Sequence, residues 1–166
     1  MKPHELFALM SLAQATEIFT WLQAEQKPVY KAAISGLAAQ RNLRAVFVER
    51  KAPAERYPWM KSALGHKHGN GVAEHIVQAW LLGAQKKMLC DFLDALGIAH
   101  GGDGTVENIP TSPPREQIAS AVDRLLANYP REAVAIYLQS FCAMDLAAAW
   151  PALQEMLRDD ARLRLG

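Results

Sequence analysis

The chain has 166 residues, of which 51% are hydrophobic and 21% charged, and its formal net charge is +1. This size fits one domain with a substantial core, and the composition argues against disorder, a fibrous repeat or a membrane span. The charge is uneven: residues 41–68 carry seven Arg and Lys against two Glu, whereas the chain from residue 89 carries eleven Asp and Glu against six Arg. We expect the basic residues to be solvated or paired with the acidic half.

The N-terminal apolar residues have helical spacing over about residues 4–25. A longer step between Ser11 and Thr16 predicts a break there, with Thr16 able to cap a second helix. The run at 6–15 also imitates a short secretory segment, but Glu5 offsets the nearby basic charge. We therefore expect a cytoplasmic protein, and leave open whether this run is a cleaved signal.

Prolines mark the next helix starts. Pro28 suits the first turn of a helix running to about Gln40, and Pro53 begins another helix that contains Pro58. Between these helices, the segment 45–48 is a short β-prone patch.

The longest predicted helix covers 72–96 and is expected to be central. Its apolar face changes at Gly83, so its halves pack against different neighbours or the helix bends there. Gly97 followed by Ile98 predicts a helix C-cap. Cys90 and Cys142 fall in apolar helical segments and are interpreted as buried, reduced side chains.

Glycine and proline predict loops at 65–71 and 97–114. Ser112 is expected to cap a helix running through Leu126, and the last helix is expected at about 151–158. The predicted fold is all-α: a single domain over 1–166, built as a bundle or as stacked antiparallel helical pairs. It should have about seven to nine helices around the central helix.

A glycine-rich string within the second loop reads Gly101-Gly102-Asp103-Gly104-Thr105. It resembles the Gly-Gly-Asp-Gly-Thr loop of the NAD kinase and diacylglycerol kinase families, in which backbone amides approach nucleotide phosphates. Such a loop requires a strand before it and a helix directly after it. Here the flanks predict a helix before and prolines after, so we judge 101–105 a false match and expect a surface turn without bound nucleotide.

Three histidines form the densest group of candidate metal ligands. His66 and His68 lie on the first loop and His75 lies one turn into the next helix, so the three together could hold a metal ion. His100 and Asp103 could form an acid/base pair, although a turn is the simpler reading of their loop.

The basic segment 41–61 gives a third hypothesis, because cations neutralise phosphate and aromatic rings stack on bases. The candidate contact residues, for a nucleic acid or another partner, are Arg41, Arg44, Arg50, Lys51 and Arg56. The interleaved rings are those of Phe47, Tyr57 and Trp59.

These observations favour a non-catalytic binding or assembly protein with no cofactor. A protein partner or a second copy of the chain is the expected contact, nucleic acid is not favoured, and no membrane partner is expected. The alternatives are a small metalloprotein or enzyme using the histidine group, and a nucleic-acid-binding protein using the basic segment.

Overall fold

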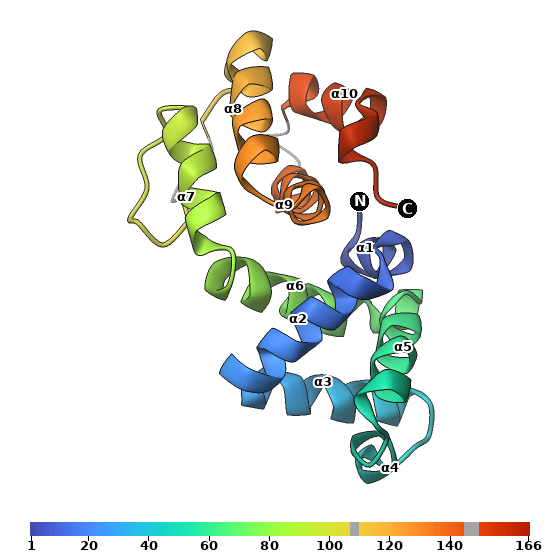
Figure 1. Cartoon of the computed structure of the whole chain (residues 1–166). Coiled ribbons are helices and arrows are strands. Elements are labelled where there is room, and N and C mark those ends of the chain that lie inside the picture. Colours follow the sequence, from blue (N-terminus) through green and yellow to red (C-terminus); the bar gives the residue numbers. More distant parts are fainter. Residues whose placement is uncertain (107–109, 145–149) are drawn as a thin grey trace. The chain divides into compact units, whose positions relative to one another are not determined.

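A computed structural model of the chain describes residues 1–106, 110–144 and 150–166 (Figure 1). In these ranges the backbone forms ten α-helices and two short 3₁₀ helices, and it forms no β-strand. The all-α class predicted from the sequence is confirmed, although the helices outnumber the seven to nine expected. No helix in the described part of the chain is long and apolar enough to cross a membrane.

The chain divides into two compact units, residues 2–80 and residues 81–165. The first unit contains α1 Pro3–Leu9, α2 Leu12–Glu25, α3 Lys27–Gln40, α4 Ala45–Glu49, α5 Pro53–Leu64 and most of α6 Asn70–Gly83. The second contains α7 Lys86–Ala95, α8 Arg115–Asn128, α9 Arg131–Met144 and α10 Pro151–Asp159. A 3₁₀ turn, Lys67–Gly69, precedes α6, and another, Ala161–Leu163, follows α10. That both units belong to one domain stays a prediction, to be tested by whether they unfold together.

The break between the first two helices lies at Met10 and Ser11, so the second helix begins earlier than predicted. Ser11, not Thr16, is the N-cap of α2, and its hydroxyl accepts a hydrogen bond from the backbone N–H of Gln14 at 3.0 Å. A short hydroxyl side chain at this position satisfies an amide that has no partner within the helix.

The proline-based predictions are confirmed. Pro28 lies in the first turn of α3, α5 begins at Pro53, and Pro58 lies inside α5. The aromatic core of this unit joins α1, α2 and α5: the Phe7 ring stacks on Phe19 at 5.9 Å between centroids, and Phe19 lies 5.5 Å from Tyr57.

The predicted central helix is two helices. α6 ends at Gly83 and α7 begins at Lys86, so the change of apolar face at Gly83 coincides with a break and not with a continuous helix. The faces themselves were predicted correctly, because Trp80 and Phe92 are both fully buried. Two different apolar faces cannot both stay inside on one straight helix of this length.

The second unit packs around an aromatic cluster. The Phe92 ring on α7 lies 5.5 Å from Tyr137 and 5.6 Å from Phe141, both on α9, and Phe141 lies 4.9 Å from Trp150. α7 lies beside α8, and α10 lies against α8 and α9 (Figure 1).

Gly97 is the predicted C-cap of α7. It has φ of 67°, its N–H donates to the Asp94 carbonyl, and the Ile98 N–H donates to the Leu93 carbonyl, the bond pattern of a Schellman motif. α8 begins later than predicted, at Arg115, and its N-cap is Pro114. Ser112 therefore does not cap it, and its hydroxyl instead lies 3.3 Å from the Pro113 carbonyl oxygen.

The predicted loop at 65–71 is partly helical. The 3₁₀ turn occupies its middle, α6 already begins at Asn70, and Gly69 is buried. Glu107, Asn108 and Ile109 of the second loop lie outside the described residues.

Candidate functional site

The most unusual surface in the described chain is the connection between α3 and α5, here called the α4 tip and comprising residues 41–51. Leu43, Val46 and Phe47 leave 43%, 39% and 57% of their surface exposed. They make up half of the large hydrophobic residues that are exposed among the described residues. Large apolar side chains grouped at the surface indicate an interaction site more often than an accident of packing.

The local sequence explains how the tip forms. The segment 45–48, interpreted above as β-prone, is the short helix α4. Val48 points inward and is 1% exposed, whereas its neighbour Phe47 points outward. In a helix, successive residues lie about 100° apart, so burying Val48 turns Phe47 and Val46 away from the unit.

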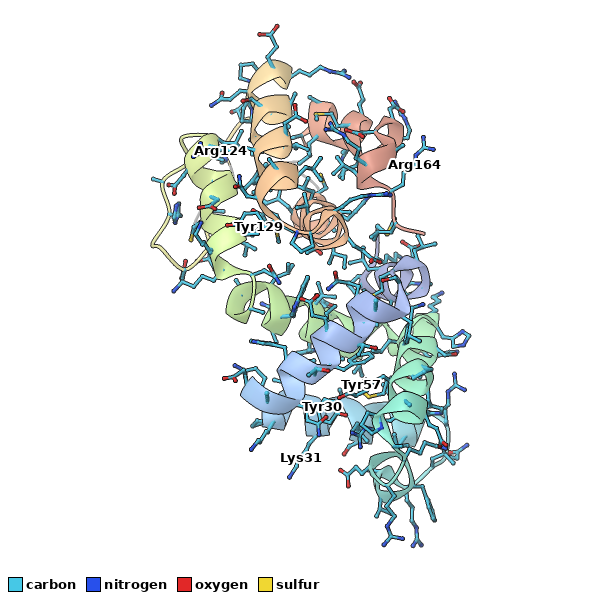
Figure 2. All side chains as sticks on the ribbon, viewed as in Figure 1. Tyr30, Lys31, Tyr57, Arg124, Tyr129 and Arg164 are labelled. Atoms are coloured by element: carbon cyan, nitrogen blue, oxygen red, sulfur yellow. The ribbon has the colours of Figure 1, made fainter. Side chains whose placement is uncertain are left out.

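Arg56 on α5 anchors this helix. Its guanidinium donates a 2.8 Å hydrogen bond to the carbonyl oxygen of Glu49, the last residue of α4, where partial negative charge accumulates. The same group lies 5.8 Å from the Tyr30 ring centroid and 5.7 Å from that of Tyr57, a cation–π arrangement. Both rings belong to the first unit (Figure 2).

This position corrects one prediction. Arg56 was expected on a basic contact surface, but it is only 7% exposed and acts inside the unit as a structural residue. The tyrosine hydroxyls are also interior: Tyr57 donates to the Gln23 side chain at 2.9 Å, and burial raises the pKa of Tyr30 to about 12.

The other predicted cations are on the surface. Arg41, Arg44 and Arg50 are exposed and make no ion pair with any residue that the structure describes. Lys51 lies 3.8 Å from Glu55, a pair that is largely solvated. The structure thus brings four of the five predicted basic residues together around the exposed Leu43, Val46 and Phe47.

Acidic residues of the second unit form ion pairs with basic residues of the same unit. Glu155 pairs with Arg115 at 2.7 Å, and Arg162 pairs with Asp160 at 2.7 Å and with Asp123 at 2.9 Å. We expected the basic segment to pair with these acids, but the described residues contain no ion pair between the two.

Fewer aromatic rings are available for stacking on bases than the nucleic-acid hypothesis predicted. Tyr57 is buried and Trp59 is half-buried, which leaves Phe47 as the exposed ring of the three that were predicted to stack on bases.

The geometry gives the histidine hypothesis no support. His66, His68 and His75 are all exposed, and His75 donates from Nδ1 to the Gly71 carbonyl at 2.7 Å, back toward its own helix. Across the described residues, no three His, Cys, Asp or Glu side chains lie close enough to hold one metal ion. The sequence spacing suited a metal site, but the turn at 67–69 does not bring the three imidazole rings together.

His100 pairs with a different carboxylate from the one predicted. Its Nε2 lies 3.1 Å from Asp94 Oδ1, while its Nδ1 accepts the Gly102 N–H at 3.1 Å. An accepting Nδ1 leaves Nε2 as the donor to Asp94, so local hydrogen bonds occupy both ring nitrogens. Asp103 instead accepts from the backbone and the hydroxyl of Thr105, which lowers its pKa and forms an Asx-type turn.

The glycine-rich string has the flanks that the sequence predicted. A helix, α7, ends before it, and α8 begins only at Arg115. Gly102 and Gly104 have φ of 79° and 83°, which a turn requires and a side chain disfavours. That 101–105 binds no nucleotide stays a prediction.

A second polar cluster joins α7 to the turn after α8. Lys87 Nζ lies 2.7 Å from Asp91 Oδ2 and 3.2 Å from the hydroxyl of Tyr129, which also donates to Asp91. These bonds lower the pKa of Asp91 and raise that of Lys87. Because Lys87 is 80% exposed, these bonds resemble a surface contact that joins α7 to the turn after α8 more than a catalytic centre.

The remaining candidates are the two cysteines and an open pocket. Both cysteines are free and half-buried, less buried than predicted, and desolvation raises the pKa of Cys142 to about 11, which disfavours a thiolate. An open pocket of about 360 Å³ in the second unit is lined by Leu96, Gly97, Ile98, Ala99, Pro110, Thr111 and Pro113. None of these side chains ionises, so the pocket offers no acid, base or nucleophile.

Sequence reasoning missed Leu43 and Val46 as site residues and identified Phe47 only as a possible stacking ring. A helical reading of 43–50 would have placed Leu43 and Phe47, four residues apart, on one face, but it would not have shown that this face is exposed. In comparisons with known proteins, no family model, curated protein or solved structure matches this chain.

Proposed function

We propose that the protein is a non-catalytic binding protein that contacts its partner through the α4 tip. One observation carries this proposal: three large apolar side chains and four cations share an outward-facing segment, and three of those cations make no ion pair with any described residue. Covering exposed apolar surface with a partner is favourable, and a partner of opposite charge can pair with the free cations.

The segment is also held in one conformation. Burial of Val48 and the bond from Arg56 to Glu49 fix α4 before a partner arrives. A preorganised surface loses less conformational entropy on binding, so a small contact can give useful affinity.

Catalysis has less support. The titratable groups that the structure brings together, at Lys87 with Asp91 and at Asp94 with His100, are exposed or bound in local hydrogen bonds. The described pocket has no ionisable lining. The exposed cations and Phe47 are also compatible with nucleic-acid binding, which the nuclease step of the test below would detect.

The proposal is tested by photo-crosslinking in the cell that makes the protein. A benzophenone amino acid replaces Phe47 in the full chain, and a matched control carries the same group at Ser35, an exposed position on α3. We expect a discrete adduct from position 47 that weakens when Arg44 and Arg50 are replaced by Gln, and none from position 35.

Equal labelling at both positions, or adducts unaffected by the arginine replacements, would contradict a contact at the tip. An adduct that disappears on nuclease treatment would keep the contact and identify its partner as nucleic acid.

A further inference from the structure

Resting on the proposed function, we infer that the partner of the α4 tip is an anionic phospholipid surface, which the tip contacts peripherally. Figure 1 shows α4 at the end of the first unit, next to the ends of α3 and α5. The expectation of no membrane partner rested on the absence of a spanning segment, and peripheral contact requires none.

Charge is the first argument. Residues 41–51 contain Arg41, Arg44, Arg50 and Lys51 against Glu49 alone, 4 − 1 = +3. Basic residues next to an anionic leaflet each strengthen binding about fivefold, and a guanidinium can bind phosphate oxygens through two parallel N–H donors.

The chemistry of the tip between these cations is the second argument. Leu43, Val46 and Phe47 are the exposed large apolar side chains there, and Asn42 is the one uncharged polar side chain in the segment. Proteins that bind single-stranded nucleic acid stack successive bases on several aromatic rings, whereas this segment has one ring, that of Phe47. Apolar side chains flanked by cations match the boundary between headgroups and acyl chains.

Size is the third argument. A stable protein–protein interface takes roughly 20–30 residues from each side. The tip has eleven residues, and α4 itself has five. A lipid surface needs no complementary shape, because a few inserted side chains and several phosphate contacts suffice for reversible binding.

The test is co-sedimentation of the full chain with sucrose-loaded vesicles at 0.1 M KCl. One set contains phosphatidylcholine alone, and the other contains 30 mol% phosphatidylserine. We expect binding to the anionic set only, decreasing as salt rises, because added salt screens the charges.

Variants locate the contact. Phe47→Ser should weaken vesicle binding about tenfold or more, and Arg44→Gln or Arg50→Gln about fivefold each. Two matched controls should bind like the wild type: Leu12→Ser, which replaces an apolar residue that is 46% exposed on α2, and Arg124→Gln, which removes an exposed charge on α8. Circular dichroism confirms that each variant is folded.

Three results would overturn the inference: no binding to anionic vesicles, equal binding to both vesicle sets, or equal losses in the controls and the tip variants. If vesicles fail to bind while position 47 still forms a protein adduct in cells, the partner is a protein; the lipid inference then fails and the proposed function stands.

Discussion

Arg56 stabilises the fold, although the other predicted basic residues of its segment are exposed. Its hydrogen bond to Glu49 and its contacts with Tyr30 and Tyr57 are interior, while Arg50, six residues earlier, is exposed. Replacing Arg56 by Ala should lower the free energy of unfolding by about 1.5–3 kcal/mol, the range for a buried hydrogen bond from a charged group.

The control is Arg50→Ala, which should change the free energy of unfolding by less than about 0.5 kcal/mol, as is usual at an exposed site. Urea denaturation of both variants measures the difference. Equal values for the two arginines would show that the anchoring role assigned to Arg56 is wrong.

Asp91 provides a pH-dependent test. Its folded pKa lies below the ordinary value because Lys87 and Tyr129 hydrogen-bond to the carboxylate. The associated stability is therefore present above the unfolded pKa of about 3.9 and is lost as pH falls through the folded pKa.

Replacing Asp91 by Asn should cost at most about 1 kcal/mol at pH 7, since the ion pair with Lys87 is solvated. The difference from the wild type should shrink as the pH falls below the unfolded pKa and disappear once it has passed the lowered folded pKa. Thermal unfolding across this range measures it, and a difference that grows in acid would refute the assignment.

Helix ends were predicted best where a backbone restriction determines them. Pro28, Pro53 and Gly97 all mark boundaries where expected, because proline fixes φ and glycine tolerates positive φ whatever the rest of the fold does. Which side chain is buried depends on distant neighbours, so the sequence could not separate Phe47 from Val48, or Arg56 from Arg50.

The α6–α7 break shows the same limit for a whole element. The two apolar faces of the segment 72–96 were visible in the sequence, but a bend and a break at Gly83 give the same pattern of apolar residues. Convergence of side chains is harder still: the spacing of His66, His68 and His75 suited a metal, and only the coordinates show that the three do not meet.

The turn before α6 can be tested with two neighbouring glycines. A Cβ added at Gly69 would lie 2.7 Å from the Ala63 carbonyl oxygen and 3.0 Å from Leu64 Cα, so the backbone must move. Gly69→Ala should therefore cost about 1–3 kcal/mol in stability.

Gly71 is the matched control, because a Cβ there meets nothing within 4 Å and the residue lies in the first turn of α6. Gly71→Ala should leave stability unchanged or raise it by up to about 1 kcal/mol through helix propensity. Thermal unfolding compares the two, and a stabilised Gly69→Ala would show that the 3₁₀ turn does not pack on α5 as described.

At the scale of the whole molecule, the sequence predicts one domain while the contacts define two compact units, residues 2–80 and 81–165. Cooperativity decides between one domain and two. Leu153 on α10 is fully buried, and Leu153→Ala should destabilise the second unit by about 2–5 kcal/mol.

If the chain is one cooperative domain, hydrogen exchange of the slowest amides in α2 should accelerate by the same factor as in α8. Mass spectrometry of the exchanged protein reads both helices at once. Unchanged exchange in α2 would show that the units unfold separately, and the single-domain prediction would be wrong.

The central claim is that the exposed side chains of the α4 tip are kept for contact and not for folding, and the unfolding free energies of two adjacent variants test it most directly. Phe47→Ser removes an exposed ring, whereas Val48→Ser places a hydroxyl at a position that is 1% exposed. We expect Phe47→Ser to stay within about 0.5 kcal/mol of the wild type and Val48→Ser to lose about 2 kcal/mol or more. A loss of that size at Phe47 would contradict the account, because it would make the ring part of the core.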